Sequence, residues 1–179
     1  MKSLFMRYAL LGLLIACAAP ARAYTDTIPN PDRFNMSAFM GAYRFDDFPY
    51  DPCMLFGTRL GLRLREGLEV EGEFLMGSVE NRTLEDGFLA NVNLRVVAYP
   101  FRSRLIKPYG FGGLGYYEFT GFEGQVPDSR FGWLAGAGAS FAFSAKTRGF
   151  TELRLAYFPT HPWGQPGQFG AVWGVRRSF

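Results

Sequence analysis

The sequence has little of the chemistry on which most active sites depend. Its 179 residues include one histidine, His161, and two cysteines, Cys17 and Cys53. No zinc-type spacing, phosphate-binding loop or nucleotide fingerprint is present, so no cofactor and no bound metal is expected. No apolar run reaches the roughly 20 residues that a membrane-spanning helix needs.

The amino-terminal residues have the organisation of a secretory signal peptide. Lys2 and Arg7 precede an apolar run over residues 8–16, and small residues at Ala21 and Ala23 close the segment. We expect cleavage after Ala23. An alternative is lipidation at Cys17, because residues 14–17, LIAC, resemble a lipobox, although the A-x-A ending favours ordinary cleavage.

Removal of residues 1–23 changes what the charge implies. The formal net charge falls from +3 to zero, because three cations and no acid leave. The sequence pI of about 9.0 therefore does not indicate a nucleic-acid partner. Only Cys53 would remain, which excludes an intramolecular disulfide.

The stretch LFGTRLGLRLREGLEVEGEFL, residues 55–75, alternates charged and apolar side chains. Arginines at 59, 63 and 65 and glutamates at 69, 71 and 73 take odd positions, whereas leucine, valine and phenylalanine take even ones. A period of two predicts β-strands with one ionic and one apolar face. A three-residue loop over 65–67, with Gly67 left-handed, would pair Leu64 with Leu68, Arg63 with Glu69, Arg59 with Glu73, and Gly61 with Glu71.

About eight such segments follow residue 36, separated by turn-forming clusters. FLANVNLRVVA, residues 88–98, alternates most clearly, and FGWLAGAGASFAF, residues 131–143, places aromatic residues at both ends of an alanine strip. Longer connections alternate with short ones, as they do at the two ends of an outer-membrane barrel.

Two folds could use these strands. A soluble lipocalin-like barrel or sandwich turns its apolar faces inward, whereas a membrane barrel turns them to lipid. The export signal, the near 9–11-residue strands and the aromatic strand ends favour the membrane barrel. We predict an all-β protein, an eight-stranded antiparallel up-and-down transmembrane β-barrel over residues 36–179, with both termini periplasmic and residues 24–35 forming a periplasmic segment.

The motifs KPYGFGGLGYY and FGWLAGAGASF, and the final strand VWGVRRSF, resemble the small eight-stranded outer-membrane barrels of the OmpA/OmpX type. The resemblance implies residence in the Gram-negative outer membrane after Sec export, with outer-membrane lipid, lipopolysaccharide and the barrel-assembly machinery as partners. It implies that Phe179 belongs to the assembly signal, and Arg177 departs from the usual pattern of that signal. We expect no counterpart of the OmpA-type peptidoglycan-binding domain, because the sequence stops at the last strand. A monomer without nucleic-acid partners is expected.

An eight-stranded barrel has an interior only wide enough for its own side chains. Charged residues predicted to fill it as a closed ion-pair network are Arg59, Arg63, Glu69, Glu71, Glu73, Arg95, Glu118, Glu152, Arg154 and Arg176. Because each glutamate would lie beside arginines, we interpret these residues as structural rather than catalytic. A narrow ion conduit is an alternative.

An enzyme that modifies lipid A, a deacylase or acyltransferase, is the second alternative. Such a site needs a base near a nucleophile, but His161 has no neighbouring serine, and Trp163 occupies the second position after it. Loop acids Asp46, Asp47 and Asp51 have weak calcium-ligand spacing and are interpreted as solvated. The sequence thus predicts a barrel without catalytic residues, serving envelope integrity or surface interaction.

Overall fold

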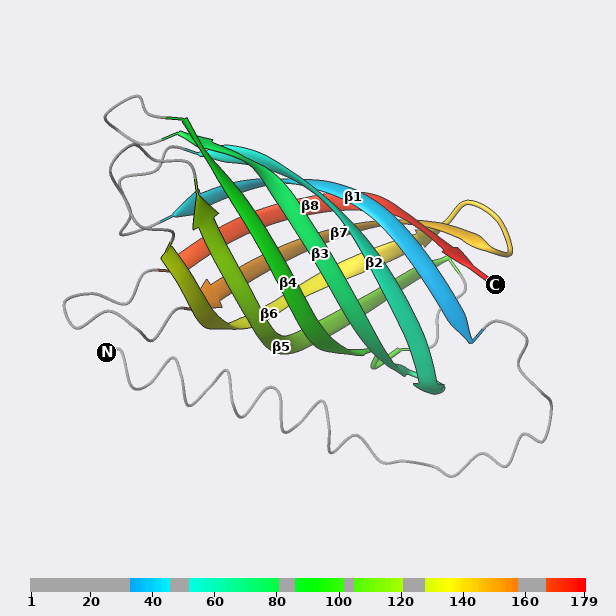
Figure 1. Ribbon diagram of the computed structural model, residues 1–179. Helices are drawn as coiled ribbons and strands as arrows, with labels where there is room; N and C mark the ends of the chain where they lie inside the picture. Colours follow the sequence, from blue (N-terminus) through cyan, green and yellow to red (C-terminus); the bar gives the residue numbers. More distant parts are fainter. Residues whose placement is uncertain (1–32, 46–51, 81–85, 102–104, 121–127, 158–166) are drawn as a thin grey trace, which may run out of the picture.

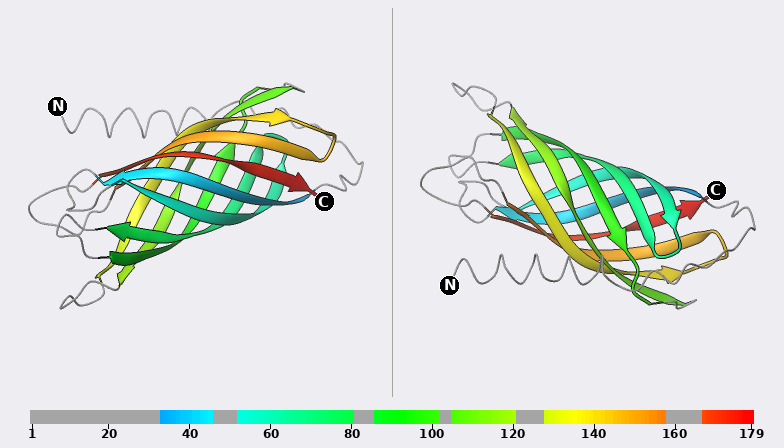
Figure 2. Two further views of the ribbon diagram at one scale, coloured as in Figure 1. Left: turned by 90° about the horizontal axis from the view of Figure 1, so that it is seen from above. Right: turned by 90° about the horizontal axis from the view of Figure 1, so that it is seen from below.

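A computed structural model describes residues 33–45, 52–80, 86–101, 105–120, 128–157 and 167–179. These residues form one closed antiparallel barrel in which each strand pairs with its neighbours in sequence and the first pairs with the last (Figures 1 and 2). The strands are β1 (Phe34–Phe45), β2 (Cys53–Arg65), β3 (Leu68–Glu80), β4 (Asp86–Ala98), β5 (Ile106–Thr120), β6 (Asp128–Ala142), β7 (Thr147–Tyr157) and β8 (Gly167–Ser178). The predicted eight-stranded up-and-down barrel is confirmed.

The two ends of the barrel differ. At the turn end, β2 meets β3 and β6 meets β7 through short turns, and β1 begins beside the end of β8. At the loop end, the connections 46–51, 81–85, 121–127 and 158–166 lie outside the described residues. The barrel begins at Phe34, two residues before the expected boundary, because Asn35 and Met36 already pair with β2 and β8.

Strand β4 shows how the sequence selects its faces. Asn91, Asn93 and Arg95 are buried inside the barrel, whereas Val92 and Leu94 between them are exposed on the outside. This is the reverse of a soluble sheet, whose apolar face is the buried one. The alternation therefore gives a polar interior and an apolar exterior.

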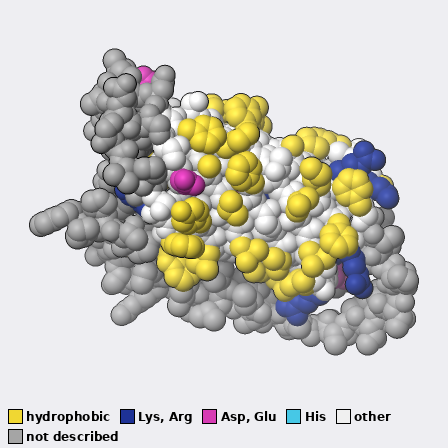
Figure 3. Space-filling view, in the orientation of Figure 1, with side chains coloured by type: hydrophobic (Ala, Val, Ile, Leu, Met, Phe, Trp, Pro, Cys, Tyr) yellow, Lys and Arg dark blue, Asp and Glu magenta, His cyan; other side chains and the backbone are white. Residues whose placement is uncertain are grey.

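The exterior carries the side-chain pattern of a membrane protein. Exposed aromatic residues lie toward both strand ends, as with Phe131 and Phe141 on β6, and smaller aliphatic side chains lie between them. Hydrophobic side chains cover the middle of the face drawn in Figure 3, and lysine and arginine gather at the turn end. Strands of 11–15 residues are long enough to cross a bilayer, for which a tilted strand needs about 9–11 residues. Among the described residues there is no helix that is both long and apolar enough to span a membrane.

Strand β5 faces the opposite way from its prediction. Glu118 was expected inside, but its side chain is exposed, whereas Tyr117 and Phe119 are buried. The register explains the difference, because Phe111 lies opposite Gly136 on β6, and a side chain built on Gly136 would occupy the space of the Phe111 ring. Inward aromatic rings fill the volume that interior glycines leave, and Glu118 therefore points outward.

The turn between β2 and β3 corrects one predicted pair. Arg63 lies opposite Glu69 and Arg59 opposite Glu73, as predicted, but Leu68 pairs with Arg65 rather than Leu64. The register shifts between Arg63 and Arg65, and this bulge lets a charged residue pair with an apolar one across a two-residue turn, in place of the predicted three-residue loop. Gly67 adopts the predicted left-handed conformation, with φ of 80°.

Candidate functional site: the barrel interior

Glu152 on β7 is the centre of the ion-pair network inside the barrel. Arg59 donates to its two oxygens at 2.9 and 2.7 Å, and Arg95 donates to both at 2.9 and 3.1 Å. Arg154 and the Tyr109 hydroxyl each add a hydrogen bond at 2.8 Å. One carboxylate therefore joins side chains from four other positions on strands β2, β4, β5 and β7.

Glu73 and Glu71 on β3 bind the same arginines from the other side. Glu73 accepts from Arg59 Nε at 2.5 Å and from Arg154 Nη1 at 2.7 Å. Glu71 accepts from Arg95 Nε at 2.7 Å and also pairs with Arg176. Because Arg59 and Arg95 each bridge β3 and β7, the network spans the barrel rather than following its wall.

A second group lies nearer the turn end, around Glu69. Its carboxylate accepts from Arg176 at 3.1 Å, and from Arg63, Asn35 and the Tyr99 hydroxyl at 3.3 Å each. Arg63 is partly exposed, with 29% of its side chain accessible, whereas Glu69 is buried. Among the residues that the structure describes, this polar group is therefore partly exposed to the surrounding medium at the turn end, at Arg63.

Aromatic rings pack against the guanidinium groups. The Phe39 ring lies 4.0 Å from the Arg59 guanidinium carbon, the Phe111 ring 4.4 Å from that of Arg95, and Phe150 is 4.8 Å from Arg59. At these distances each ring face attracts the cation. The rings also exclude water, which strengthens the ion pairs that remain.

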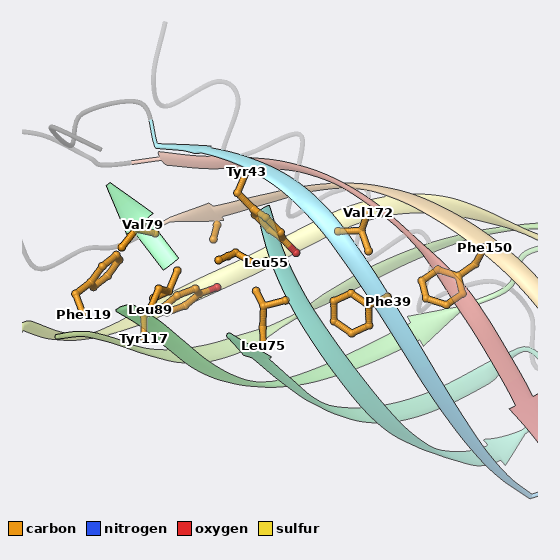
Figure 4. Close-up of a cluster of buried hydrophobic side chains, with 11 residues drawn as sticks. Phe39, Tyr43, Leu55, Leu75, Val79, Leu89, Tyr117, Phe119, Phe150 and Val172 are labelled. Carbon is orange, nitrogen blue, oxygen red and sulfur yellow. The ribbon is translucent and has the colours of Figure 1, made fainter. Parts of the chain in front are cut away.

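Toward the loop end, apolar side chains fill much of the interior (Figure 4), and Arg130 and Gln168 are buried there as well. Side chains from seven strands form one buried cluster there and toward the centre. Its members are Phe39, Tyr43, Leu55, Leu75, Val79, Leu89, Tyr117, Phe119, Phe150, Ala156 and Val172. The sequence analysis did not predict this cluster. The alternation of odd and even positions assigns a residue to the inner face, but it does not say whether the inner face is polar or apolar at a given position along the barrel axis.

The structure separates the predicted interior residues into three groups. Arg63 is partly exposed at the turn end, and Glu118 is outside the barrel on β5. The remaining residues are buried and paired: Arg59, Glu69, Glu71, Glu73, Arg95, Glu152, Arg154 and Arg176. Four arginines thus meet four glutamates, so the formal charges of this buried set cancel.

Several predicted features are elsewhere. Phe179 follows β8 at the turn end, where its backbone N–H donates to the Phe34 carbonyl at 2.9 Å. Ala21 and Ala23 of the signal peptide, Cys17, the loop acids Asp46, Asp47 and Asp51, and the loop pair of His161 and Trp163 lie outside the described residues. Cys53, at the start of β2, is a partly buried free thiol.

In the interior network, the arginines and glutamates neutralise each other's charges. Every glutamate in it accepts hydrogen bonds from at least one arginine, and the arginines reach two or more acceptors. No group of three or more potential metal ligands occurs within the described ranges. The arrangement fits a permanent cross-brace better than proton transfer, since buried charges of this kind are stable only when they stay paired.

An eight-stranded barrel with a polar, filled interior and an apolar exterior defines the class of small outer-membrane barrels. The chain belongs to the family described as the outer membrane protein beta-barrel domain, which matches residues 9–160. It therefore resides in the Gram-negative outer membrane. No curated protein matches the sequence significantly.

Solved structures share the fold at low sequence identity. Neisserial surface protein A is 17% identical, with a TM-score of 0.64 over 82% of this chain and 97% of the other. The barrel domain of OprF from Pseudomonas aeruginosa is 17% identical, with a TM-score of 0.53 over 81% and 97%. Ail, the attachment invasion locus protein of Yersinia pestis, is 16% identical, with a TM-score of 0.54 over 83% and 99%. The outer membrane enzyme PagL is 18% identical, with a TM-score of 0.50 over 81% and 99%.

Proposed function

We propose that this protein is a non-enzymatic, closed outer-membrane barrel that serves envelope integrity or interaction at the cell surface. The single observation that carries the proposal is the content of its interior, in which a neutralised network of four arginines and four glutamates is followed by an apolar cluster. A barrel filled in this way is a rigid support for its connecting loops. Function would then lie in those loops and in the lipid-facing wall.

The interior argues against an ion conduit. An ion passing along the axis would have to displace the Arg59 and Arg95 pairs with Glu152, all buried and within 3.1 Å of each other. It would then meet Leu55, Leu75 and other apolar side chains that offer no hydrogen-bonding partner. We expect no discrete conductance steps from the purified protein in planar bilayers, and reproducible steps would contradict a closed barrel.

Some fold neighbours support the surface role. Neisserial surface protein A is named for the cell surface, and Ail for attachment and invasion, with one Ail structure determined in complex with the heparin analogue sucrose octasulfate. For this chain we propose interaction through the loops at the loop end. The termini would then lie in the periplasm, and lipopolysaccharide would surround the loop end of a monomer assembled by the barrel-assembly machinery.

The lipid A-modifying alternative is tested by lipid analysis. Mass spectra of lipid A from a deletion strain and its parent should show the same acyl composition if the barrel is not an enzyme. A changed acyl number that plasmid-borne wild-type protein restores would overturn the proposal. Replacement His161→Ala in the restoring plasmid then separates the two roles, because a surface protein should tolerate it while a deacylase that uses this histidine should not.

Folding of the purified chain is checked independently by gel migration. A barrel of this class resists detergent at room temperature and unfolds on boiling, so the unheated band should migrate differently from the boiled one. A single heat-independent band would question the preparation before any functional result is interpreted.

A further inference from the structure

A groove runs across the outer wall of β1, β2 and β3 near the turn end. It has a volume of about 440 Å³, within the range of about 300–1,000 Å³ common for small-molecule sites. Six apolar side chains line it: Phe34, Met36, Leu60, Leu62, Val70 and Phe179. These side chains face outward, so the groove opens to the hydrocarbon of the membrane.

Gly72 on β3 lines the groove and has no side chain to fill it. It lies directly opposite Leu60 on β2, and Leu62 pairs with Val70 one step closer to the turn. A Cβ atom placed on Gly72 would have no protein atom within 4 Å. The space beside it is therefore not filled by a neighbouring ring, in contrast to the glycines inside the barrel.

The side chain of Arg177 lies at one side of the groove. Arg177 on β8 lies opposite Met36, a groove-lining residue, and its guanidinium carbon is 5.7 Å from the centre of the Phe179 ring, which also lines the groove. Arg177 is exposed and forms no ion pair with any residue that the structure describes. The apolar groove thus lies beside the positive charge of Arg177 at the turn end of the barrel.

We propose that the groove binds an acyl chain of an anionic phospholipid, with the lipid phosphate at Arg177. The apolar lining matches the chain, and the guanidinium matches the phosphate, which it binds well through parallel N–H donors. A phospholipid is the source because the turn end faces the periplasmic leaflet in the proposed orientation. This site is independent of the closed interior and of any role of the loops.

Two substitutions test the two halves of the site. Gly72→Leu places a side chain in the groove at a position where a new Cβ atom meets no protein atom within 4 Å, and Arg177→Gln removes the charge while keeping the chain length similar. Two matched controls are used. Gly110→Leu changes an open position on β5, where a new Cβ atom would lie 3.8 Å from the Gly136 carbonyl oxygen, and Arg44→Gln changes an exposed arginine at the loop end. Heat-dependent gel migration verifies that each variant is folded.

The measurement is native mass spectrometry of the full chain in detergent, titrated with dioleoylphosphatidylglycerol or dioleoylphosphatidylcholine. We expect the wild-type chain to retain one phosphatidylglycerol at a concentration at least fivefold lower than phosphatidylcholine. Gly72→Leu should lower retention of both lipids at least fivefold, and Arg177→Gln should reduce phosphatidylglycerol to the phosphatidylcholine level. Both controls should behave as the wild-type chain does.

Three results would overturn the inference. Folded Gly72→Leu protein that retains phosphatidylglycerol like the wild-type chain would show that the groove is not the site. Stronger retention of lipid A than of phosphatidylglycerol would assign the site to the other leaflet. A dimer that disappears in Gly72→Leu would assign the groove to a second copy of the chain. None of these outcomes bears on whether the barrel interior is closed.

Discussion

Arg95 and Glu152 belong to strands that are three positions apart around the barrel, yet their side chains meet inside it through two parallel hydrogen bonds of 2.9 and 3.1 Å. Arg59 binds the same carboxylate in the same two-bonded manner. Such contacts link strands that share no backbone hydrogen bonds. The interior network therefore adds cross-links to a sheet whose backbone hydrogen bonds join only neighbouring strands.

Loss of the Glu152 charge should destabilise the barrel strongly. Glu152→Gln leaves Arg59, Arg95 and Arg154 with one fewer anion in a buried site, and removal of one member of a buried pair costs about 3–5 kcal/mol. The free energy of unfolding, measured by urea titration of the protein in lipid vesicles, should fall by that order. Glu118→Gln makes the same chemical change on the exterior and should alter stability by less than about 0.5 kcal/mol. Equal effects at the two positions would contradict the described orientation of β5 and β7.

Glycines inside and outside the barrel should respond differently to alanine. A Cβ on Gly136 would overlap the Phe111 ring and the Leu153 carbonyl, whereas one on Gly110 meets only a carbonyl oxygen at 3.8 Å. We expect Gly136→Ala to cost about 1–3 kcal/mol, as overpacking does. Gly110→Ala should be neutral or slightly stabilising, since glycine weakens a strand. The same urea titration compares them, and a larger loss for Gly110→Ala would refute the register between β5 and β6.

Much of the architecture could be predicted because the alternation of polar and apolar residues at odd and even positions is a strong signal in a β-sheet. Residues 90–96 alternate without exception, and the charged pairs Arg63 with Glu69 and Arg59 with Glu73 followed from placing like faces opposite each other. The glutamates and arginines of β3 and β7 were placed inside on the same ground. Their partners across the barrel were not predictable, because sequence parity says nothing about which side chains meet across the interior.

The wrong prediction for Glu118 shows that the alternation within one strand does not always decide which face of that strand lies inside the barrel. The prediction that Glu118 faces the interior assigns the aromatic residues at the alternate positions of β5 to the outer face. A signal was present on β6, where Gly136 and Gly138 share the inner face with Ser140 and lie opposite Phe111 and Tyr109. Residues directly opposite each other share a face, so the neighbouring glycines indicate inward rings.

The turn at Gly67 should tolerate little change. Its φ of 80° lies in the left-handed region, which costs an L-residue about 1–2 kcal/mol. Gly67→Ala should lower the unfolding free energy by about that amount, and Gly67→Asn by less, because asparagine adopts this conformation more readily. Gly72→Ala, on the same strand pair but with open space around its new Cβ, is the control. An alanine at 67 that costs no more than one at 72 would argue against the described turn.

The cost of placing an arginine on the exterior of the barrel should depend on how deep the position lies in the membrane. Val92 lies at the middle of β4 and Phe88 near its loop end, and both side chains face outward. Arginine on the lipid face costs about 2–4 kcal/mol at the bilayer midplane and about 0–1 near the interface. We therefore expect the unfolding free energy of Val92→Arg, measured relative to Val92→Ala, to fall by about 2–4 kcal/mol. Phe88→Arg relative to Phe88→Ala should differ by less than about 1 kcal/mol.

Comparison with alanine at each site removes the contribution of the lost valine or phenylalanine. The experiment distinguishes a lipid-facing wall from a solvated one, because an arginine on a water-exposed strand would cost little at either position. Asn93→Ala, one residue away on the inner face, supplies the reference for a change inside the barrel, where it removes the hydrogen bond to Glu73 of 2.8 Å. Similar costs for arginine at 92 and at 88 would mean that depth in the bilayer does not set the energetics of this wall, and the assignment of its apolar face to lipid would fail.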